Sequence, residues 1–247
     1  MNIVAVKERV RRALNFIFAL FYTGNVRFLL YLSRKGGLGT VSSFVENSFL
    51  FECACNGAPQ EGAVVEIGSF KGRTTISLAY GSYLKNREKV YAVDPQEKHE
   101  VKQLFLKNIR NSGVQAYISP IFKISEDAAG DFHGPIRLLF IDGCHEYGYV
   151  KKDILLWKGL LSEGGIIAMH DYGPQSFETF AKDVCRAVKE CIIDDPDFIV
   201  EGCVDSVFFA SWKVSRPENR KIFERYKKIE KKRAYLKLRL DKSVLKY

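Results

Sequence analysis

The feature that most constrains the fold of this chain is the regular alternation of short apolar runs with longer segments of helical periodicity. The apolar runs are continuous rather than alternating, which is typical of strands buried on both faces of a parallel sheet. We therefore predict an α/β fold in which helices connect the strands. The expected strands are 63–67, 89–93, 115–121, 136–141 and 164–169, and the expected helices are 74–84, 97–109, 126–131, 149–161 and 176–190.

The connections between these strands define the expected topology. Crossovers between parallel strands are almost always right-handed, so we expect a doubly wound, Rossmann-like sheet. Two further strand-like runs, 198–203 and 206–212, flank Val204-Asp205 and are expected to form a terminal antiparallel hairpin. Ser42-Ser43 precede an apolar segment that is expected to be helical to about Cys55, and either serine can cap this helix.

Both ends of the chain are predicted to be helical extensions of the sheet domain. The first segment places apolar side chains on one face of a helix and basic ones mainly off it, and ends in a glycine-rich break. The last segment repeats apolar side chains at helical spacing in a basic background. We therefore expect an amphipathic extension at 1–40, the main domain at 41–213 and a basic C-terminal helix at 214–247.

The net positive charge of the chain comes from its two ends. The net charge is +9, but residues 1–35 carry +6 and residues 213–247 carry +10, which leaves −7 for residues 36–212. An acidic middle domain argues against a nucleic-acid-binding core. The basic ends suggest a partner with negative charge, such as an anionic membrane surface, and the alternative is a solvated helix and a homodimer contact.

The cellular compartment is indicated by the cysteines and by the apolar segments. The six cysteines form no C-x-x-C pair and lie mostly inside expected helices and strands, so free thiols in a reducing cytoplasm are expected. The longest apolar stretch, 13–32, is interrupted by polar and basic residues, and no signal cleavage site follows it. The expected location is the cytoplasm, including the inner face of the membrane.

A glycine loop follows the first strand. Gly68 and Gly72 permit a tight turn and a close approach of the backbone to a ligand at the N-terminus of the next helix. The G-x-x-x-G spacing differs from the G-x-G-x-x-G of dinucleotide sites, which disfavours a nicotinamide-dependent oxidoreductase. It suits a ligand with a carboxylate and a sulfonium. Glu66 can order this loop or lie near the positive charge of the ligand, and a purely structural turn is the alternative.

Polar residues also follow the second and third strands. Asp94 lies 26 residues beyond Gly68 and can accept two hydrogen bonds from ribose hydroxyls, whereas its alternative role is to cap the next helix. Ser125 follows the third strand and can either cap its own helix or face an adenine ring.

Acids and histidines follow the fourth and fifth strands. Asp142 and His145 come after one strand, and His170 and Asp171 come after the other. Because the carboxyl ends of parallel strands meet at one edge of the sheet, we expect all four side chains at the same cleft. A single histidine is usually structural, but two converging histidine–aspartate pairs favour a functional site.

The stretch from Val64 to Asp171 resembles class I S-adenosylmethionine-dependent methyltransferases of the group that includes the macrocin and cephalosporin-type O-methyltransferases. The sequence VVEIGSFKGRTT at 64–75 resembles their cofactor loop. FIDGCHEY at 140–147, followed by Asp153, resembles their I-D-G-x-H-x-Y segment and its later acid. GGIIAMHD at 164–171 resembles their closing strand. The resemblance covers a little under half of the chain.

This resemblance implies a seven-stranded sheet with a last antiparallel strand, and S-adenosylmethionine as cofactor. Many relatives also hold a divalent metal such as Mg²⁺, for which Asp142 and Asp171 are the candidate ligands. Relatives with such a metal often have a second acid where this chain has His170, which favours a softer metal or none, so both remain open. The candidate cofactor-binding residues are Glu66, Gly68, Ser69, Gly72, Thr74, Asp94, Ser125 and Asp142.

The expected reaction is transfer of a methyl group to a hydroxyl, by resemblance that of a sugar in a glycan, glycolipid or natural product. The acceptor must lose a proton, and His145 is the candidate base with His170 as its rival. The basic tail motivates nucleic-acid methylation as an alternative, but the Asn/Asp-Pro-Pro-aromatic motif of amino-methylating enzymes is missing after the fourth strand. A non-catalytic binding module on the same fold is the third hypothesis, and the intact loop and strand-end acids argue against it.

Overall fold

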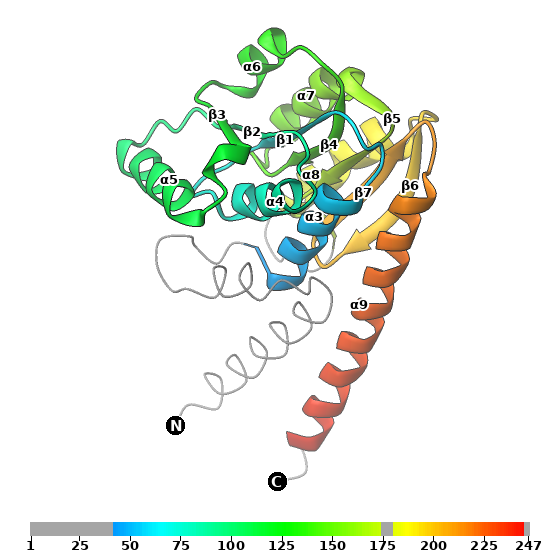
Figure 1. The fold of residues 1–247 in the computed structure, drawn as a ribbon. Helices are drawn as coiled ribbons and strands as arrows, with labels where there is room; N and C mark the ends of the chain where they lie inside the picture. The colour runs from blue at the N-terminus through cyan, green and yellow to red at the C-terminus, as the bar shows by residue number, and fades with distance from the viewer. Residues whose placement is uncertain (1–41, 174–179, 245–247) are drawn as a thin grey trace.

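The computed structural model describes residues 42–173 and 180–244 of the chain. A seven-stranded sheet runs through these residues in the spatial order β3-β2-β1-β4-β5-β7-β6 (Figure 1). The expected amphipathic extension at 1–40 lies outside the described residues. The strands are β1 Ala63–Ile67, β2 Val90–Val93, β3 Ile118–Ile121, β4 Ile136–Ile141, β5 Leu161–Met169, β6 Phe198–Val204 and β7 Val207–Trp212.

The sheet is mostly parallel, with antiparallel strands contributed by the end of the chain. Strands β1 to β5 pair in parallel, whereas β7 pairs antiparallel with both β5 and β6. The strand order reverses between β1 and β4, and ligands of doubly wound sheets bind at the carboxyl ends of strands beside such a point. The predicted doubly wound sheet with a terminal antiparallel hairpin is confirmed.

Helices cover both faces of the sheet and form two separate cores. Neighbouring strand residues such as Leu138 and Leu139 belong to opposite cores, which explains why the strands are apolar without alternation. The helices that contribute buried residues to the first core are α3 Phe44–Asn56, α4 Arg73–Leu84, α5 His99–Ser112 and α9 Pro217–Val244, and those of the second are α6 Ser125–Asp131, α7 Tyr147–Trp157 and α8 Phe180–Val188.

Several element ends differ from those predicted. Gln115–Tyr117 form a 3-10 turn rather than the start of β3, which leaves only four residues in this edge strand. Pro120 is tolerated there because one side of an edge strand makes no ladder hydrogen bonds. Lys158–Leu160 form a second 3-10 turn between α7 and β5, where the sequence predicted continued helix.

Helix α3 begins at the predicted cap. The hydroxyl of Ser43 accepts a hydrogen bond from the backbone N–H of Glu46 (3.1 Å), and the Glu46 carboxylate accepts one from the backbone N–H of Ser43 (2.6 Å). This reciprocal pair is a capping box, which satisfies N–H groups that a helix start otherwise leaves unpaired. The helix is almost entirely buried, with Phe49 and Leu50 fully inaccessible.

The first turns of α9 pack in the same core as α3. The ring centroid of Phe49 lies 5.2 Å from that of Tyr226 and 6.1 Å from that of Phe223. The Asn219 amide accepts a hydrogen bond from the Ala58 backbone N–H (2.7 Å) and donates one to the Gly164 carbonyl (2.9 Å). The expected basic helix therefore starts as a packed part of the domain, and the domain boundary at 213 stays a prediction.

Among the described helices, none combines the length and the apolar character that a membrane crossing requires.

Candidate active site

The loop after β1 requires glycine at its first position. Gly68 has a φ of +88°, and a Cβ atom there would lie 2.1 Å from the backbone oxygen of Asp142. Its N–H donates to the carbonyl of Val93 at the end of β2 (2.8 Å). The loop is thereby fixed between the carboxyl ends of β2 and β4.

Gly72 forms the other end of this loop and the N-cap of α4. Its φ is +84°, and its N–H donates to the carbonyl of Ser69 (2.7 Å). A Cβ atom there would touch the ring of Phe105 at 3.0 Å. The predicted residues Ser69 and Thr74 are both buried at this turn. The predicted tight turn at a helix N-terminus is therefore present.

Asp94 follows β2 and lies against the same loop. One of its carboxylate oxygens accepts a hydrogen bond from the backbone N–H of Phe70 (2.8 Å), and the other accepts one from the backbone N–H of Gln96 (2.8 Å). Each oxygen keeps a second lone pair, so the carboxylate can also accept from ribose hydroxyls. It does not cap α5, because Lys98 stands at that N-cap.

Gln96 is a loop residue that the sequence reasoning missed. Its side-chain amide donates to the backbone carbonyl of Phe70 (2.8 Å) and lies 3.5 Å from the Ser69 hydroxyl. Its side-chain oxygen is buried without a hydrogen-bond partner among the described residues. The only sequence signal was its position two residues after Asp94, beyond a proline.

Glu66 is fully buried at the end of β1. The hydroxyl of Thr75 donates to its Oε2 atom, whereas its Oε1 atom is buried without a partner among the described residues. Burial, opposed by the Thr75 hydrogen bond, raises the pKa of Glu66 well above its ordinary value. A buried acidic side chain with a partnerless oxygen beside a glycine loop fits a ligand that carries positive charge, because such a ligand would favour the ionised form of Glu66.

Ser125 is placed differently from the expectation that it caps its helix. Ile124 is the N-cap of α6, and Ser125 is the first residue of the helix. The hydroxyl of Ser125 accepts a hydrogen bond from the indole N–H of Trp157 (2.9 Å). Its side chain therefore links α6 to α7, and its predicted contact with an adenine ring stays a prediction.

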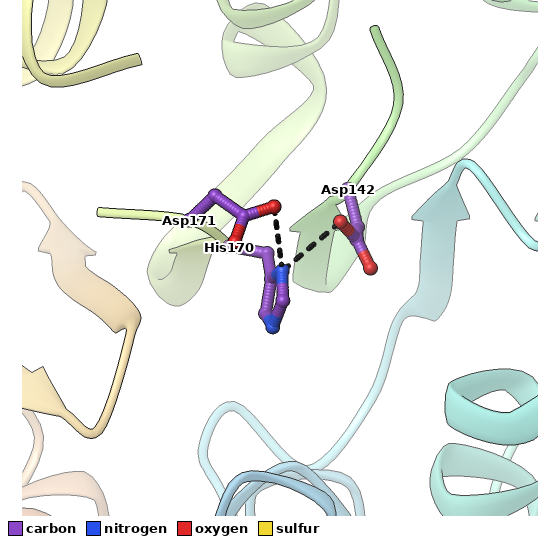
Figure 2. Close-up of side chains that lie close together, drawn as sticks. All are labelled: Asp142, His170 and Asp171. Carbon is purple, nitrogen blue, oxygen red and sulfur yellow. Dashed lines mark ion pairs between the residues drawn. The ribbon is translucent and has the colours of Figure 1, made fainter. Parts of the chain in front are cut away.

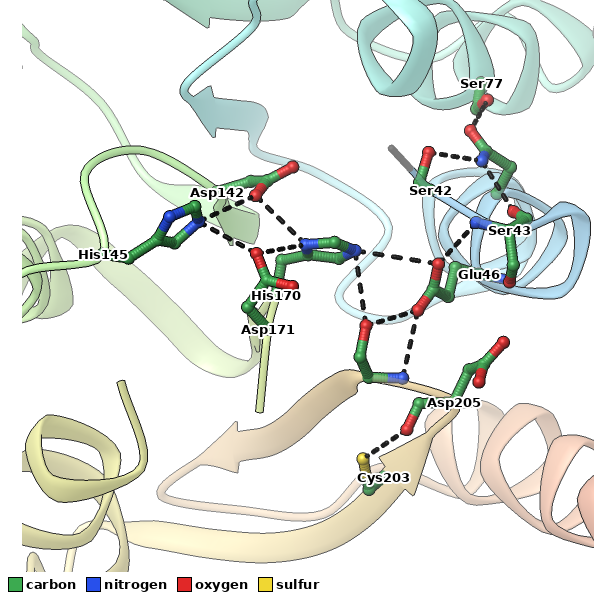
Figure 3. A network of polar contacts seen from close by, with 12 residues as sticks. Ser42, Ser43, Glu46, Ser77, Asp142, His145, His170, Asp171, Cys203 and Asp205 are labelled. Carbon is green, nitrogen blue, oxygen red and sulfur yellow. Dashed lines mark hydrogen bonds and ion pairs between the residues drawn. The ribbon is translucent and has the colours of Figure 1, made fainter. Parts of the chain in front are cut away.

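The four predicted strand-end residues lie together at one edge of the sheet. Nδ1 of His170 lies 3.1 Å from a carboxylate oxygen of Asp142 and 3.1 Å from one of Asp171 (Figure 2). Nε2 of His145 lies 2.9 Å from the same oxygen of Asp171 and 3.8 Å from Asp142. In Figure 3 the two acids lie between the two imidazole rings.

The two histidines differ sharply in accessibility. The side chain of His145 is 33% exposed, whereas that of His170 is 2% exposed. The ring of His145 is therefore partly open to solvent, although its Nε2 atom is buried against the acids, whereas the ring of His170 is closed off.

Two further residues, which the sequence reasoning did not identify, lie on the far side of His170. Nε2 of His170 is 3.7 Å from Oε2 of Glu46, at the start of α3 (Figure 3). It also lies 3.4 Å from the hydroxyl of Ser206, in the turn between β6 and β7. The Ser206 hydroxyl donates to Oε1 of Glu46 (2.6 Å). The sequence carried one signal, the Ser-x-x-Glu spacing of residues 43–46, but it indicated only a helix cap.

The charges in this cluster alternate in sign. Hydrogen bonds to Asp142 and Asp171 raise the pKa of His145 to about 10. Burial acts to lower the pKa of His170, but the charge of Asp142 and hydrogen bonds to its carboxylate neighbours raise that pKa well above its ordinary value. Burial likewise opposes ionisation of Glu46, yet contact with His170 and Ser206 lowers its pKa to about 2. The acids are thus compensated by positive charge on both sides.

The spacing of the cluster fits a divalent cation. The candidate ligand atoms of Asp142, His170 and Asp171 lie within 4.8 Å of one another. Neighbouring ligands of a six-coordinate ion with bonds of about 2.1 Å lie about 3 Å apart, close to the two 3.1 Å separations at Nδ1. An imidazole nitrogen among the donors favours a transition metal over Mg²⁺.

Comparison with known proteins gives a family match for the middle of the chain. A family described as "Methyltransferase domain" matches residues 65–172, which include the glycine loop and both strand-end pairs. An uncharacterised protein, R132 of Acanthamoeba polyphaga mimivirus, is 31% identical over 140 residues, which cover 53% of this chain. The match spans 59% of the viral protein's length.

Solved structures share the fold over most of the chain. The cofactor-bound protein Rv0187 from MTB is 22% identical with a TM-score of 0.60, and the match covers 80% of this chain and 94% of that one. An O-methyltransferase from Bacillus cereus in complex with SAH is 15% identical with a TM-score of 0.58, and covers 76% and 90%. The chain therefore has a Rossmann-like methyltransferase fold.

Proposed function

We propose, from the methyltransferase domain that residues 65–172 form, that this protein transfers the methyl group of S-adenosylmethionine to a hydroxyl group of a small molecule. The O-methyltransferase activity named for the Bacillus cereus structure supports the choice of a hydroxyl acceptor. The leading acceptor class is a sugar hydroxyl of a glycan, glycolipid or natural product, and this choice rests on the motifs at 140–147 and 164–171.

The cofactor lies at the carboxyl ends of β1 and β2 in this proposal. The backbone of the glycine loop holds its carboxylate, and Asp94 accepts hydrogen bonds from its ribose. The buried Oε1 atom of Glu66, which has no partner among the described residues, receives the positively charged end. Glu66 would then match a cofactor that carries positive charge, and not the anionic pyrophosphate of a dinucleotide.

Asp142, His170 and Asp171 would hold a divalent metal at the carboxyl ends of β4 and β5. When bound, the ion supplies positive charge that stabilises an acceptor alkoxide and weakens the hold of the two acids on the proton of His145. The protein itself aligns the two reactants, which contributes on the order of 7–11 kcal/mol to a displacement reaction. His145 is the proposed base, since its ring is accessible and that of His170 is not.

The observation that carries this proposal is the meeting of the glycine loop, Asp94 and the Asp142–Asp171 pair at one edge of the sheet. The test is calorimetry of the full-length protein with S-adenosylhomocysteine and with NAD. We expect binding of the first and none of the second. Asp94→Ala should weaken S-adenosylhomocysteine binding about 10- to 100-fold, the loss of hydrogen bonds to a charged group.

Asp131→Ala is the matched control, because this surface acid pairs only with Lys123 among the described residues and is distant in sequence from the loop. Unchanged affinity in Asp94→Ala would remove the ribose role, and binding of NAD alone would overturn the proposed reaction.

The base is tested by turnover with a panel of hydroxylated sugars. His145→Ala should reduce turnover about 10²- to 10⁴-fold while S-adenosylhomocysteine affinity stays unchanged. Near wild-type turnover in both His145→Ala and His170→Ala would contradict a histidine base.

A second part of the proposal concerns location. Residues 1–35 and 213–247 carry most of the positive charge of the chain. This charge supports a cytoplasmic enzyme that contacts the anionic inner face of a membrane, where a glycolipid acceptor would be available. The acidic middle domain gives less support to a nucleic-acid substrate, and a homodimer contact is the competing role for the basic ends.

A further inference from the structure

His170 is held from both sides, by acids from two strand ends and by a separate pair of residues from α3 and the β6–β7 turn. We propose that Glu46 and Ser206 are positioning residues that fix the hydrogen of the His170 ring on Nε2, so that Nδ1 is the nitrogen presented to Asp142 and Asp171. The inference rests on the proposed metal site, and it adds the residues that prepare this site for an ion.

The hydrogen-bond pattern fixes which atom donates. Ser206 has one hydroxyl hydrogen, and it points to Oε1 of Glu46, at 2.6 Å. The Ser206 oxygen can then only accept from Nε2 of His170, 3.4 Å away. Oε2 of Glu46, 3.7 Å from Nε2, is a carboxylate oxygen and cannot donate either. Nε2 must therefore carry the hydrogen.

The consequence appears at the opposite nitrogen. Nδ1 faces one oxygen of Asp142 and one of Asp171, both at 3.1 Å and both without a hydrogen to give. Either a proton on Nδ1 or a bound cation in the space that these three atoms share can offset the two carboxylates. Histidines that bind metals almost always donate their other ring N–H to a carboxylate, a carbonyl or water, which sets the tautomer and the ring orientation. His170 has this arrangement before any ion binds.

Glu46 is rigid enough for this role. It is 3% exposed, and its Oε2 atom accepts the N–H of Ser43 in the capping box of α3. Its Oε1 atom also accepts the backbone N–H of Ser206 (3.0 Å). The carbonyl of Ser206 in turn accepts the N–H of Tyr172, which directly follows Asp171 (2.9 Å). The two positioning residues are thus tied to the strand end that carries the proposed ligands.

The competing explanation is that Glu46 serves only to cap α3. Ser43→Ala separates the two roles, because it removes the hydroxyl half of the capping box and leaves the Glu46 carboxylate on Ser206 and His170. Glu46→Gln does the opposite, since the glutamine oxygen can still accept the Ser43 N–H at the position of Oε2, while its amide nitrogen places N–H donors toward Ser206 at the position of Oε1. Glu52→Gln is a second control, a buried acid on the same helix that pairs with Arg225.

The experiment measures Mn²⁺ affinity of the full-length protein by calorimetry. We expect Ser206→Ala and Glu46→Gln to bind Mn²⁺ about 10- to 100-fold more weakly than the wild type. This is the usual effect of losing a residue that hydrogen-bonds to a metal-binding histidine. Ser206→Thr keeps the hydroxyl and should restore affinity, while Ser43→Ala and Glu52→Gln should match the wild type. Equal affinity in Ser206→Ala and wild type overturns the inference while leaving the methyltransferase proposal intact.

Imidazole NMR provides a reading that needs no metal. The chain has four histidines, so a His170→Asn spectrum assigns the ring of His170. We expect a protected Nε2–H signal in the wild type and in Ser206→Thr, and its loss in Ser206→Ala. Absence of this signal in the wild type, or its survival unchanged in Ser206→Ala, overturns the inference. Failure of the wild type to bind Mn²⁺ instead removes the metal from the proposed function, and the NMR result still decides the roles of Glu46 and Ser206.

Discussion

Position 68 accepts only glycine, for two independent reasons. Its φ of +88° is strained for any residue with a side chain, and the carbonyl of Asp142 occupies the space that a Cβ atom needs. We predict that Gly68→Ala lowers the free energy of unfolding by at least about 1–3 kcal/mol, the usual cost of such backbone strain. Urea unfolding followed by circular dichroism measures this loss.

Gly148→Ala is the matched control for this substitution. Gly148 lies in α7, nothing lies within 4 Å of an added Cβ, and its φ is not positive. Alanine there should leave stability unchanged or raise it by up to about 1 kcal/mol, because alanine is the better helix former. Equal unfolding midpoints for the two variants would contradict the contact between the loop and β4.

Glu66 makes stability depend on pH. Because burial raises its pKa well above 4.5, the folded protein retains a proton that the unfolded chain loses above pH 4.5. Stability is therefore lost as pH rises above that value, by up to about 1.4 kcal/mol per pH unit until the pKa of the folded state is reached. We predict that Glu66→Gln is more stable relative to wild type at pH 8 than at pH 5.

Urea unfolding at both pH values tests this prediction. Glu61→Gln is the control, an exposed acid just before β1 whose substitution should give the same small difference at both pH values. A Glu66→Gln difference that did not grow with pH would mean that Glu66 is ionised in the folded protein.

At the scale of single residues, the sequence predicted the candidate site residues that directly follow strands. Asp142, His145, His170 and Asp171 could be placed together because parallel strands deliver their carboxyl ends to one edge. Glu46 and Ser206 could not, since Ser206 lies 160 positions from Glu46 and their meeting depends on how α3 and the terminal hairpin pack on the sheet. No local pattern encodes such a contact.

At the scale of elements, continuous apolar runs identified the five parallel strands because both faces of the sheet are covered. The ends of elements were less predictable. Gln115–Tyr117 have strand-like composition, but they lie where the chain turns into an edge strand, and local turn geometry decides there. The packing of α9 was also open, because a basic amphipathic helix can bury its apolar side against its own domain or elsewhere.

The α9 helix is predicted to be needed for the stability of the domain. Phe223 is buried between α3 and β7, with its ring centroid 4.3 Å from that of Phe209. Phe223→Ala should cost about 3–5 kcal/mol through lost burial and the cavity it leaves. Lys221→Ala, an exposed position on the same helix, should change little. Similar denaturation curves for the two variants would show that α9 does not depend on this packing.

At the scale of the whole molecule, the separation of charge supports a test of membrane contact. We predict that the full-length protein floats with anionic vesicles and not with neutral ones, and that removal of residues 1–35 weakens this binding. Each Lys or Arg near an anionic surface contributes about 1 kcal/mol at low salt, so added salt should release the protein. Flotation that is independent of lipid charge, or no flotation at all, would favour the homodimer contact for the basic ends.

The overall fold was predictable because periodicity, strand burial and crossover handedness each restrict the topology to the same solution. The acceptor was not, because its recognition depends on the shape of side chains brought together from several loops, and no periodic pattern describes that surface.

The contact at Gly68 has a consequence for how binding of the proposed methyl donor and binding of a second ligand at Asp142 affect each other. The backbone of the glycine loop lies directly against the carbonyl of Asp142, and the N–H of Asp142 donates to the carbonyl of Ile67 (2.8 Å). A displacement of one loop is therefore passed to the other without a side chain to absorb it. If the methyl donor raises the affinity of a second ligand at Asp142 by some factor, then the second ligand must raise the affinity of the methyl donor by the same factor. This equality follows from thermodynamic reciprocity.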